Sequence, residues 1–187
     1  LAVVLALAVG AFAYEVRVSR LNSWELTFEC KPPRVIETSD ASAPREYTYV
    51  IYTVTNNTPQ DVDFFPTFQI ETDDGTVTCA SAFPKVTKKL SERFSRNILD
   101  STKIRGILKP GETRNGIAVF SGVDPASDML TVYAYGFSGD LKTSRDAEGK
   151  VTTLYRAYKL VYSRPGDEFV VAIDPVTLKS AEWIWRE

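Results

Sequence analysis

Residues 108–136 read LKPGETRNGIAVFSGVDPASDMLTVYAYG, and this segment carries the clearest fold signal in the chain. Pro110-Gly111 predicts a turn, and the apolar runs Gly116–Ser121 and Leu130–Phe137 predict two strands. The connection GVDPASD between the runs is too long for a two-residue hairpin. We therefore expect the two strands to lie in opposite sheets of a β-sandwich.

Strand patterns continue on both sides of this segment. Aromatic and β-branched residues fill Tyr47–Thr55, and alternating residues mark Val151–Ser163 as a long strand. One segment has a helical period instead, because its apolar residues lie four apart across about residues 85–97. The chain is expected to be mainly β: an immunoglobulin-like antiparallel β-sandwich of about seven to nine strands with one short helical insertion.

Three further segments complete this prediction. Val62–Glu71 is predicted as one strand, in which Pro66 marks an edge or a bulge. Ser138–Lys150 is polar and contains two glycines, so it predicts a loop. Glu168–Ile173 predicts another strand after a Pro-Gly-Asp turn.

The first thirteen residues, LAVVLALAVGAFA, are uncharged and almost wholly apolar. They end in Ala11-Phe12-Ala13, which fits the small-residue pattern that precedes a signal-peptide cleavage site. We expect residues 1–13 to be a signal peptide that lacks its own N-terminal part. Residues 14–187 would then form a single β-sandwich domain, secreted or held in the periplasm or at the cell surface. The alternative is an uncleaved N-terminal anchor; no later segment has transmembrane length.

Composition argues against several functional classes. The 187 residues carry a net charge of -2 and include no histidine. No basic patch stands out, so nucleic acid is not expected as a partner. Without histidine the chain lacks the commonest general base and transition-metal ligand, and it contains no P-loop, dinucleotide fingerprint or nucleophile elbow. We expect a non-enzymatic protein with no catalytic residue, no metal and no cofactor.

Cys30 and Cys79 are the only cysteines, and an even pair in an exported protein permits one disulfide. Both fall on apolar faces of expected strands. The bond would close a loop of about fifty residues and contribute roughly 3–4 kcal/mol in the chain-entropy description. The alternative is two separate buried thiols that act as small hydrophobic groups.

Four aromatic residues could form a contact surface. Trp183 and Trp185 would share one face of a C-terminal strand, and Tyr133 and Tyr135 would share one face of theirs. Exposed in one patch, such rings would stack on sugars or anchor a partner protein. The alternative is that the rings fill the core of the sandwich.

Acidic residues gather between positions 61 and 74, and several carboxylates in one loop could hold calcium. Their spacing matches no EF-hand loop, and Asp73-Asp74-Gly75 is explained as a hairpin turn. A turn is therefore the expectation here.

Several of these segments resemble known exported proteins. Tyr47–Asn57 followed by Asp61–Gly75 resembles the strand, Thr-Asn-Asn-Thr, strand, Asp-Asp-Gly pattern of secreted bacterial immunoglobulin-like domains. Leu108–Gly111 is similar to the turn of domains of the DUF4352 kind, and Gly116–Phe137 and Arg164–Arg186 resemble secreted proteins of planctomycete-type bacteria. The resemblance covers about residues 16–186 and implies an exported β-sandwich. It implies no activity and no functional residue.

The leading expectation is a non-enzymatic binding or scaffolding module whose strand edges and loops contact a protein or an envelope polymer. The alternative is a carbohydrate-binding module that uses aromatic rings as a platform. A carboxylate-based hydrolase is a third hypothesis, and it would need two carboxylates about 5–9 Å apart in a cleft.

Overall fold

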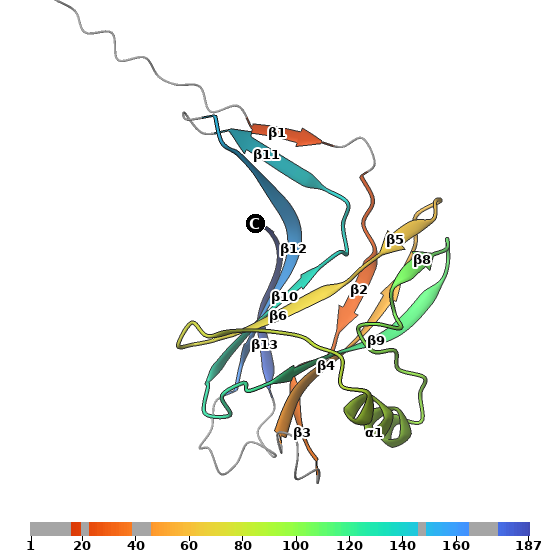
Figure 1. The fold of residues 1–187 in the computed structure, drawn as a ribbon, viewed down its shortest axis with the longest axis vertical. Coiled ribbons are helices and arrows are strands. Elements are labelled where there is room, and N and C mark those ends of the chain that lie inside the picture. The colour runs from red at the N-terminus through yellow and green to blue at the C-terminus, as the bar shows by residue number, and fades with distance from the viewer. Residues whose placement is uncertain (1–15, 20–22, 39–45, 146–148, 165–175) are drawn as a thin grey trace, which may run out of the picture.

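The computed structural model describes residues 16–19, 23–38, 46–145, 149–164 and 176–187. Within them the chain is mainly β, and its antiparallel sheets pack together as a β-sandwich (Figure 1), so the predicted fold class is confirmed. The predicted signal peptide, residues 1–13, and the predicted strand Glu168–Ile173 lie outside the described residues.

Two sheets and a short ribbon contain the described strands. The large sheet has the spatial order β1 (Val16–Ser19), β11 (Leu141–Arg145), β12 (Val151–Ser163), β10 (Met129–Tyr135), β6 (Thr67–Thr72) and β7 (Val77–Cys79), and β13 (Thr177–Arg186) also pairs with β12. The small sheet contains β2 (Thr27–Cys30), β3 (Arg34–Glu37), β4 (Glu46–Thr55) and β9 (Thr113–Ser121). The ribbon pairs β5 (Val62–Phe64) with β8 (Gly106–Leu108).

The thirteen-residue strand β12 is the centre of the large sheet. Its N-terminal half pairs with β11 and its C-terminal half with β10, while β13 pairs with residues 155–163. Because β10 and β13 pair with the same part of β12, they lie on opposite sides of it. The N-terminal half of β12 extends beyond the sandwich together with β11 and β1, and the whole strand is bowed (Figure 1).

The main core lies between the two sheets. Alternation places every second side chain of the strands β4, β6, β9, β10 and the C-terminal half of β12 on the inner face, as the pattern predicts. Phe28 from the small sheet lies among rings of both sheets, 4.3 Å from Phe137 and 5.7 Å from Tyr158 between ring centroids. The fully buried members include Tyr52, Tyr162, Phe64, Phe120 and Val132. Burial of this much aromatic area is the dominant favourable term in the stability of the sandwich.

The single described helix, α1 (Pro84–Phe94), covers the other face of the small sheet (Figure 1). Val86 and Leu90 pack in a second core with Tyr47, Tyr49 and Ile117. The predicted helix over residues 85–97 is confirmed, although the helix ends at Phe94. Among the described residues no helix has the length and hydrophobicity needed to cross a bilayer.

The strand count differs from the prediction because single predicted segments are divided. The described residues contain thirteen strands, not seven to nine. Val62–Glu71 is interrupted at Phe65-Pro66, where the chain leaves the ribbon and enters the large sheet. The interruption follows from Pro66, which has no N–H to donate to a ladder. The backbone of Phe65 is also approached closely by Gly136 (φ 83°), at which a Cβ would lie 2.6 Å from the Phe65 carbonyl oxygen.

The segment predicted as a loop, Ser138–Lys150, contains the strand β11. Its sequence LKTSR has no apolar face, because this part of the sheet extends beyond the sandwich. The prediction that Gly116–Ser121 and Leu130–Phe137 lie in opposite sheets is confirmed, since β9 belongs to the small sheet and β10 to the large one.

Asn56 joins two turns at one end of the sandwich. Its side chain is fully buried, and its Nδ2 donates to the carbonyl oxygens of Gln60 and Leu108, both at 2.8 Å. Its Oδ1 accepts hydrogen bonds from the backbone N–H and the hydroxyl of Thr58. The amide is thus fully satisfied and connects the end of β4 to the end of β8.

Arg164 joins another pair of segments. It follows β12 and is only 6% exposed. Its Nη2 donates to the carbonyl oxygens of Asp124 (3.2 Å), Pro125 and Ser127 (2.8 Å), all in the connection between β9 and β10. Asp73 accepts from the Ser127 hydroxyl at 2.7 Å in the same region. One buried guanidinium therefore organises the β9–β10 connection.

Candidate functional site

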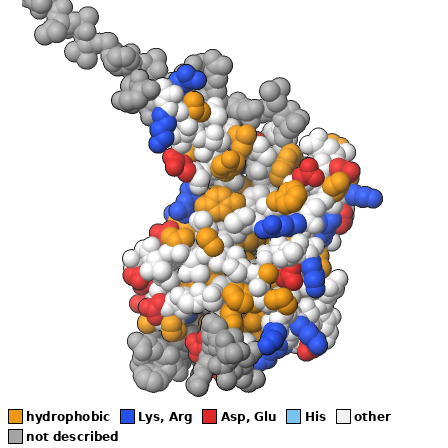
Figure 2. Space-filling view, in the orientation of Figure 1, with side chains coloured by type: hydrophobic (Ala, Val, Ile, Leu, Met, Phe, Trp, Pro, Cys, Tyr) orange, Lys and Arg blue, Asp and Glu red, His pale blue; other side chains and the backbone are white. Residues whose placement is uncertain are grey.

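The outer face of the large sheet carries two of the predicted site residues. Tyr133 and Tyr135 project from β10 on the side away from the core, because their neighbours Val132 and Ala134 are core residues. In the cross-strand register, Tyr133 lies between Gln69 of β6 and Lys159 of β12. Because the large sheet is bowed, its outer face is concave (Figure 1). Figure 2 shows this concave face as a hollow in the outline, where hydrophobic side chains reach the surface between basic and acidic ones.

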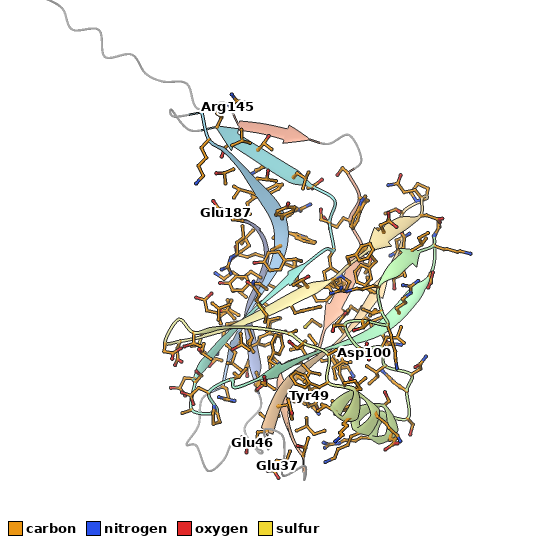
Figure 3. All side chains as sticks on the ribbon, viewed as in Figure 1. Glu37, Glu46, Tyr49, Asp100, Arg145 and Glu187 are labelled. Atoms are coloured by element: carbon orange, nitrogen blue, oxygen red, sulfur yellow. The ribbon has the colours of Figure 1, made fainter. Side chains whose placement is uncertain are left out.

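Arg186 crosses this concave face. It pairs with Tyr155 on β12, yet its guanidinium carbon lies 3.8 Å from the ring centroid of Tyr133 on β10. The side chain can reach across β12 because the sheet is bowed toward it, and Figure 3 places the next residue, Glu187, beside β12 on this side. The stacked guanidinium explains why Tyr133, although on the outer face, is only 8% exposed.

The charge on Arg186 is incompletely compensated. Its Nη1 lies 3.9 Å from Oε2 of Glu71, which is an ion pair but not a hydrogen bond. Among the described residues, this Nη1 is the one solvent-shielded side-chain nitrogen or oxygen without a hydrogen-bond partner. Burial, and then the adjacent Glu71, raise the pKa of Tyr133, so this phenol stays protonated.

Trp183 and Trp185 lie on the opposite face of the same sheet. Trp183 lies opposite Tyr158 in the β12–β13 ladder, and Tyr158 faces the core. The two rings meet edge to face, with 4.9 Å between their centroids. Arg156 covers the Trp183 ring at 4.5 Å, and Lys142 covers the Trp185 ring at 4.1 Å. The cross-strand register therefore separates the four predicted aromatic residues into two pairs, one on each face of the sheet.

Arg156 also ties the inner face to the start of the small sheet. Its Nη1 donates to Oε2 of Glu25 at 2.8 Å and to Oδ2 of Asp140 at 2.9 Å. These ion pairs hold the guanidinium over Trp183. A cation thus covers one face of each tryptophan ring.

The exposed aromatic residue on the concave face is one that the sequence reasoning missed. Tyr155 is 51% exposed and lies between Leu141 of β11 and Arg186 of β13, all on the outer face. Leu141, and Val151 at the far end of the β11–β12 ladder, are also exposed. The signal was present in the alternation of Val151–Ser163, because Tyr155 falls on the face opposite Leu154, Arg156 and Tyr158.

The strand β13 forms a free edge beside this face. It is ten residues long and pairs only with β12 in the described part of the chain. Residues 177–182 are exposed, and the strand contains no proline. Its outward N–H and C=O groups are therefore a ready template for another strand.

Cys30 and Cys79 form no disulfide. Cys30 points toward the core, where the Tyr162 hydroxyl donates to its sulfur at 3.6 Å. Cys79 lies exposed at the end of β7, opposite Gln69 on the outer face of the large sheet. The expectation that both lie on apolar faces is thus wrong for Cys79, because β7 is an edge strand whose side chains remain exposed.

Burial of Cys30 gives an alkaline dependence of stability. Burial raises the pKa of the Cys30 thiol to about 12, and it also raises the pKa values of Tyr52 and Tyr162. The unfolded chain loses these protons at lower pH than the folded chain. The contribution of these three groups to the free energy of unfolding is therefore fully present below the ordinary thiol pKa. It decreases as the pH rises above about 9.

We expect the free energy of unfolding to fall by about 2–3 kcal/mol between pH 8 and pH 10 in urea titrations. Cys30→Val should remove more than half of this fall, because the thiol is the first of the three groups to ionise in the unfolded chain. An unchanged pH slope in the valine variant would contradict the assignment.

Of the acidic residues between positions 61 and 74, Asp73 and Asp74 serve the β6–β7 turn and the β9–β10 connection, whereas Glu71 faces Arg186 and Tyr133. Asp74 accepts hydrogen bonds from the Thr72 hydroxyl at 2.6 Å and the Thr76 backbone N–H at 2.8 Å, which close the β6–β7 hairpin. These bonds hold the pKa of Asp74 below its usual value. Within the described ranges no three Cys, Asp or Glu side chains are grouped to hold a metal ion.

Comparison with known proteins gives no assignment: no protein-family profile matches the chain, and no curated protein matches its sequence. The resemblance to secreted immunoglobulin-like domains therefore stays a prediction.

Proposed function

We propose that this protein is an exported, non-enzymatic binding module that takes up an extended segment of a partner protein along the free edge of β13. The observation that carries the proposal is the length and exposure of this edge. Nine of its ten residues pair with β12, no other described strand pairs with β13, and the first six residues are exposed. Natural sheets usually protect such an edge with proline, a bulge or a covering element. β13 contains no proline, and the one irregularity in its ladder lies at Lys179, so residues 180–186 keep the regular edge that strand addition uses.

The exposed side chains of β13 support the same proposal. Those of Ser180 and Glu182 are exposed on the edge strand itself and would lie beside alternate side chains of an added strand. Main-chain hydrogen bonds along β13 would supply affinity, and these side chains would supply specificity. Export is proposed from the apolar run at residues 1–13, with its Ala-Phe-Ala ending.

Proline substitution tests the edge directly. In an antiparallel strand, successive N–H groups point alternately to the paired side and to the free side. Of Ser180→Pro and Ala181→Pro, one therefore removes an N–H from the free edge and the other removes a bond to β12. The free-edge variant should keep the thermal stability of the native chain, whereas the other variant should lose stability.

The probe is a library of random peptides selected on the immobilised full-length chain. We expect the selected peptides to alternate apolar and polar residues and to bind the stable proline variant at least about tenfold more weakly. Equal binding to both proteins, or the absence of any selected peptide, would contradict the proposal. Binding of a soluble glycan that is lost in Tyr155→Ala but kept in the proline variant would instead support a carbohydrate-binding module.

A further inference from the structure

We infer that the segment taken up along β13 is an amphipathic strand, with apolar side chains on the inner side of the edge and a lysine or arginine opposite Glu182 on the outer side. The partner chemistry rests on the proposed function, because it describes what the same edge selects. It follows from the different character of the two faces of β13.

The ladder with β12 fixes which side chains of β13 lie on each face. In the regular segment 180–186, Ala181, Trp183 and Trp185 lie on the inner face and form what we call the inner strip. Ser180, Glu182 and Ile184 lie on the outer face, because successive side chains of a strand alternate. An added strand would therefore place every second side chain beside the inner strip.

The small sheet leaves the inner strip partly open to solvent. Ala181 is exposed and both tryptophans are only half-buried, although this face of the sheet packs the main core elsewhere. Leu178, which lies opposite the core residue Tyr162 just beyond the ladder irregularity, is 46% exposed. Apolar side chains of an added strand would remove this surface from water, which favours binding.

Glu182 gives the outer side of the edge its charge. It is exposed and faces Lys159 across the β12–β13 ladder, but no ion pair joins the two within the described residues. Arg186, the other charged residue of the regular segment, is directed across β12 over the Tyr133 ring and away from the edge. An added strand therefore meets one uncompensated carboxylate, and a basic side chain directly opposite would be stabilising.

These preferences define a short pattern for an antiparallel segment. Read from its N-terminus, the residues opposite positions 186 to 180 are polar, apolar, polar, apolar, basic, large apolar and polar. The large residue fits opposite Ala181, whose side chain is a single methyl group. The probe is the end-capped peptide Thr-Val-Thr-Val-Lys-Tyr-Thr, and its control has glutamate in place of lysine.

Binding of the two peptides to the full-length chain, measured by fluorescence anisotropy, tests the role of Glu182. The lysine peptide should bind at least about threefold more tightly than the glutamate peptide. Glu182→Lys should reverse this preference, because it places like charges opposite each other in the complex with the lysine peptide. Glu29→Lys changes the net charge equally at an exposed residue of β2 in the small sheet, and it should leave the preference unchanged.

A matched pair of variants tests the inner strip. Ala181→Gln places an amide in the inner strip, whereas Ser180→Gln places the same group on the outer face. Both positions are exposed, so both variants should keep the native thermal stability. The lysine peptide should bind Ala181→Gln at least about threefold more weakly than the native chain, and Ser180→Gln about as tightly. Failure of the lysine peptide to bind, equal affinities for the two peptides, or equal effects of the two glutamine variants would overturn the inference.

The peptide library separates this failure from failure of the proposed function. If the selected peptides lose affinity for the free-edge proline variant but show no basic residue whose preference responds to Glu182→Lys, the binding module stands and the partner chemistry is wrong. If no selected peptide depends on the free edge, the proposed function itself fails.

Discussion

Asn56→Ala should lower the free energy of unfolding by about 3–4 kcal/mol, among the largest effects of any single side-chain truncation in this protein. The side chain makes four hydrogen bonds in a fully buried position. Alanine would leave the buried carbonyl oxygen of Leu108 without this donor, would leave the Gln60 carbonyl with the Thr58 hydroxyl alone, and would also create a small cavity. Each unsatisfied buried group costs about 1–3 kcal/mol, so the loss exceeds that of an ordinary surface substitution.

The adjacent residue provides a matched control. Asn57 has the same chemistry and lies in the same turn, but its side chain is exposed and makes one hydrogen bond, to the Thr27 hydroxyl. Asn57→Ala should therefore cost less than about 1 kcal/mol in urea unfolding. Similar losses for the two variants would show that the turn, rather than the buried amide, is responsible.

Arg164→Met should cost about 3 kcal/mol and should open the β9–β10 connection to proteases. Methionine has a similar length but no donor, so the buried carbonyl oxygen of Ser127 and the partly buried ones of Asp124 and Pro125 lose this donor. Burial lowers the pKa of Arg164, while the charges of Asp124, Asp128 and Asp73 oppose that shift; the guanidinium remains charged, and its removal leaves these carboxylates uncompensated.

Two further variants separate the loss of the buried guanidinium from the loss of a positive charge. Arg164→Lys keeps the charge but lacks the planar fork, so we expect an intermediate loss. Arg145→Met removes an exposed arginine of β11 and should change stability by less than about 0.5 kcal/mol. Unfolding curves and the rate of cleavage between residues 122 and 128 check both effects. A lysine variant as unstable as the methionine variant would show that the fork, not the charge, is what matters.

Alternation predicted the long strands well because each has one apolar face. Tyr47–Thr55 and Val151–Ser163 agree with β4 and β12 to within one residue. The same rule failed for β11, whose side chains have no core to face and therefore show no apolar period. Strands of this kind are stabilised by their ladder partner, which local sequence does not reveal.

The candidate site could be predicted only in part, because it depends on register. From the sequence, alternation puts Tyr133 and Tyr135 on one face of their strand and Trp183 and Trp185 on one face of theirs. It does not say whether the two pairs share a face of the sheet. That relation follows from which residue of β13 lies opposite which residue of β12, and a shift of one residue would have brought all four rings to one face. The crossing of Arg186 to Tyr133 depends in addition on the curvature of the sheet.

The large sheet collects strands from both ends of the chain, and this has a consequence for folding during synthesis. Val16 of β1 pairs with Ser144, and β12 is complete only at Ser163. Until β12 has been made, β10 lacks its second neighbour and the inner face of the sheet stays partly uncovered. Such long-range pairing places the chain among slowly folding topologies, with times of milliseconds to seconds. Under the export proposed above, a chain that closes its sandwich this slowly would still be unfolded when it is threaded through a translocation channel.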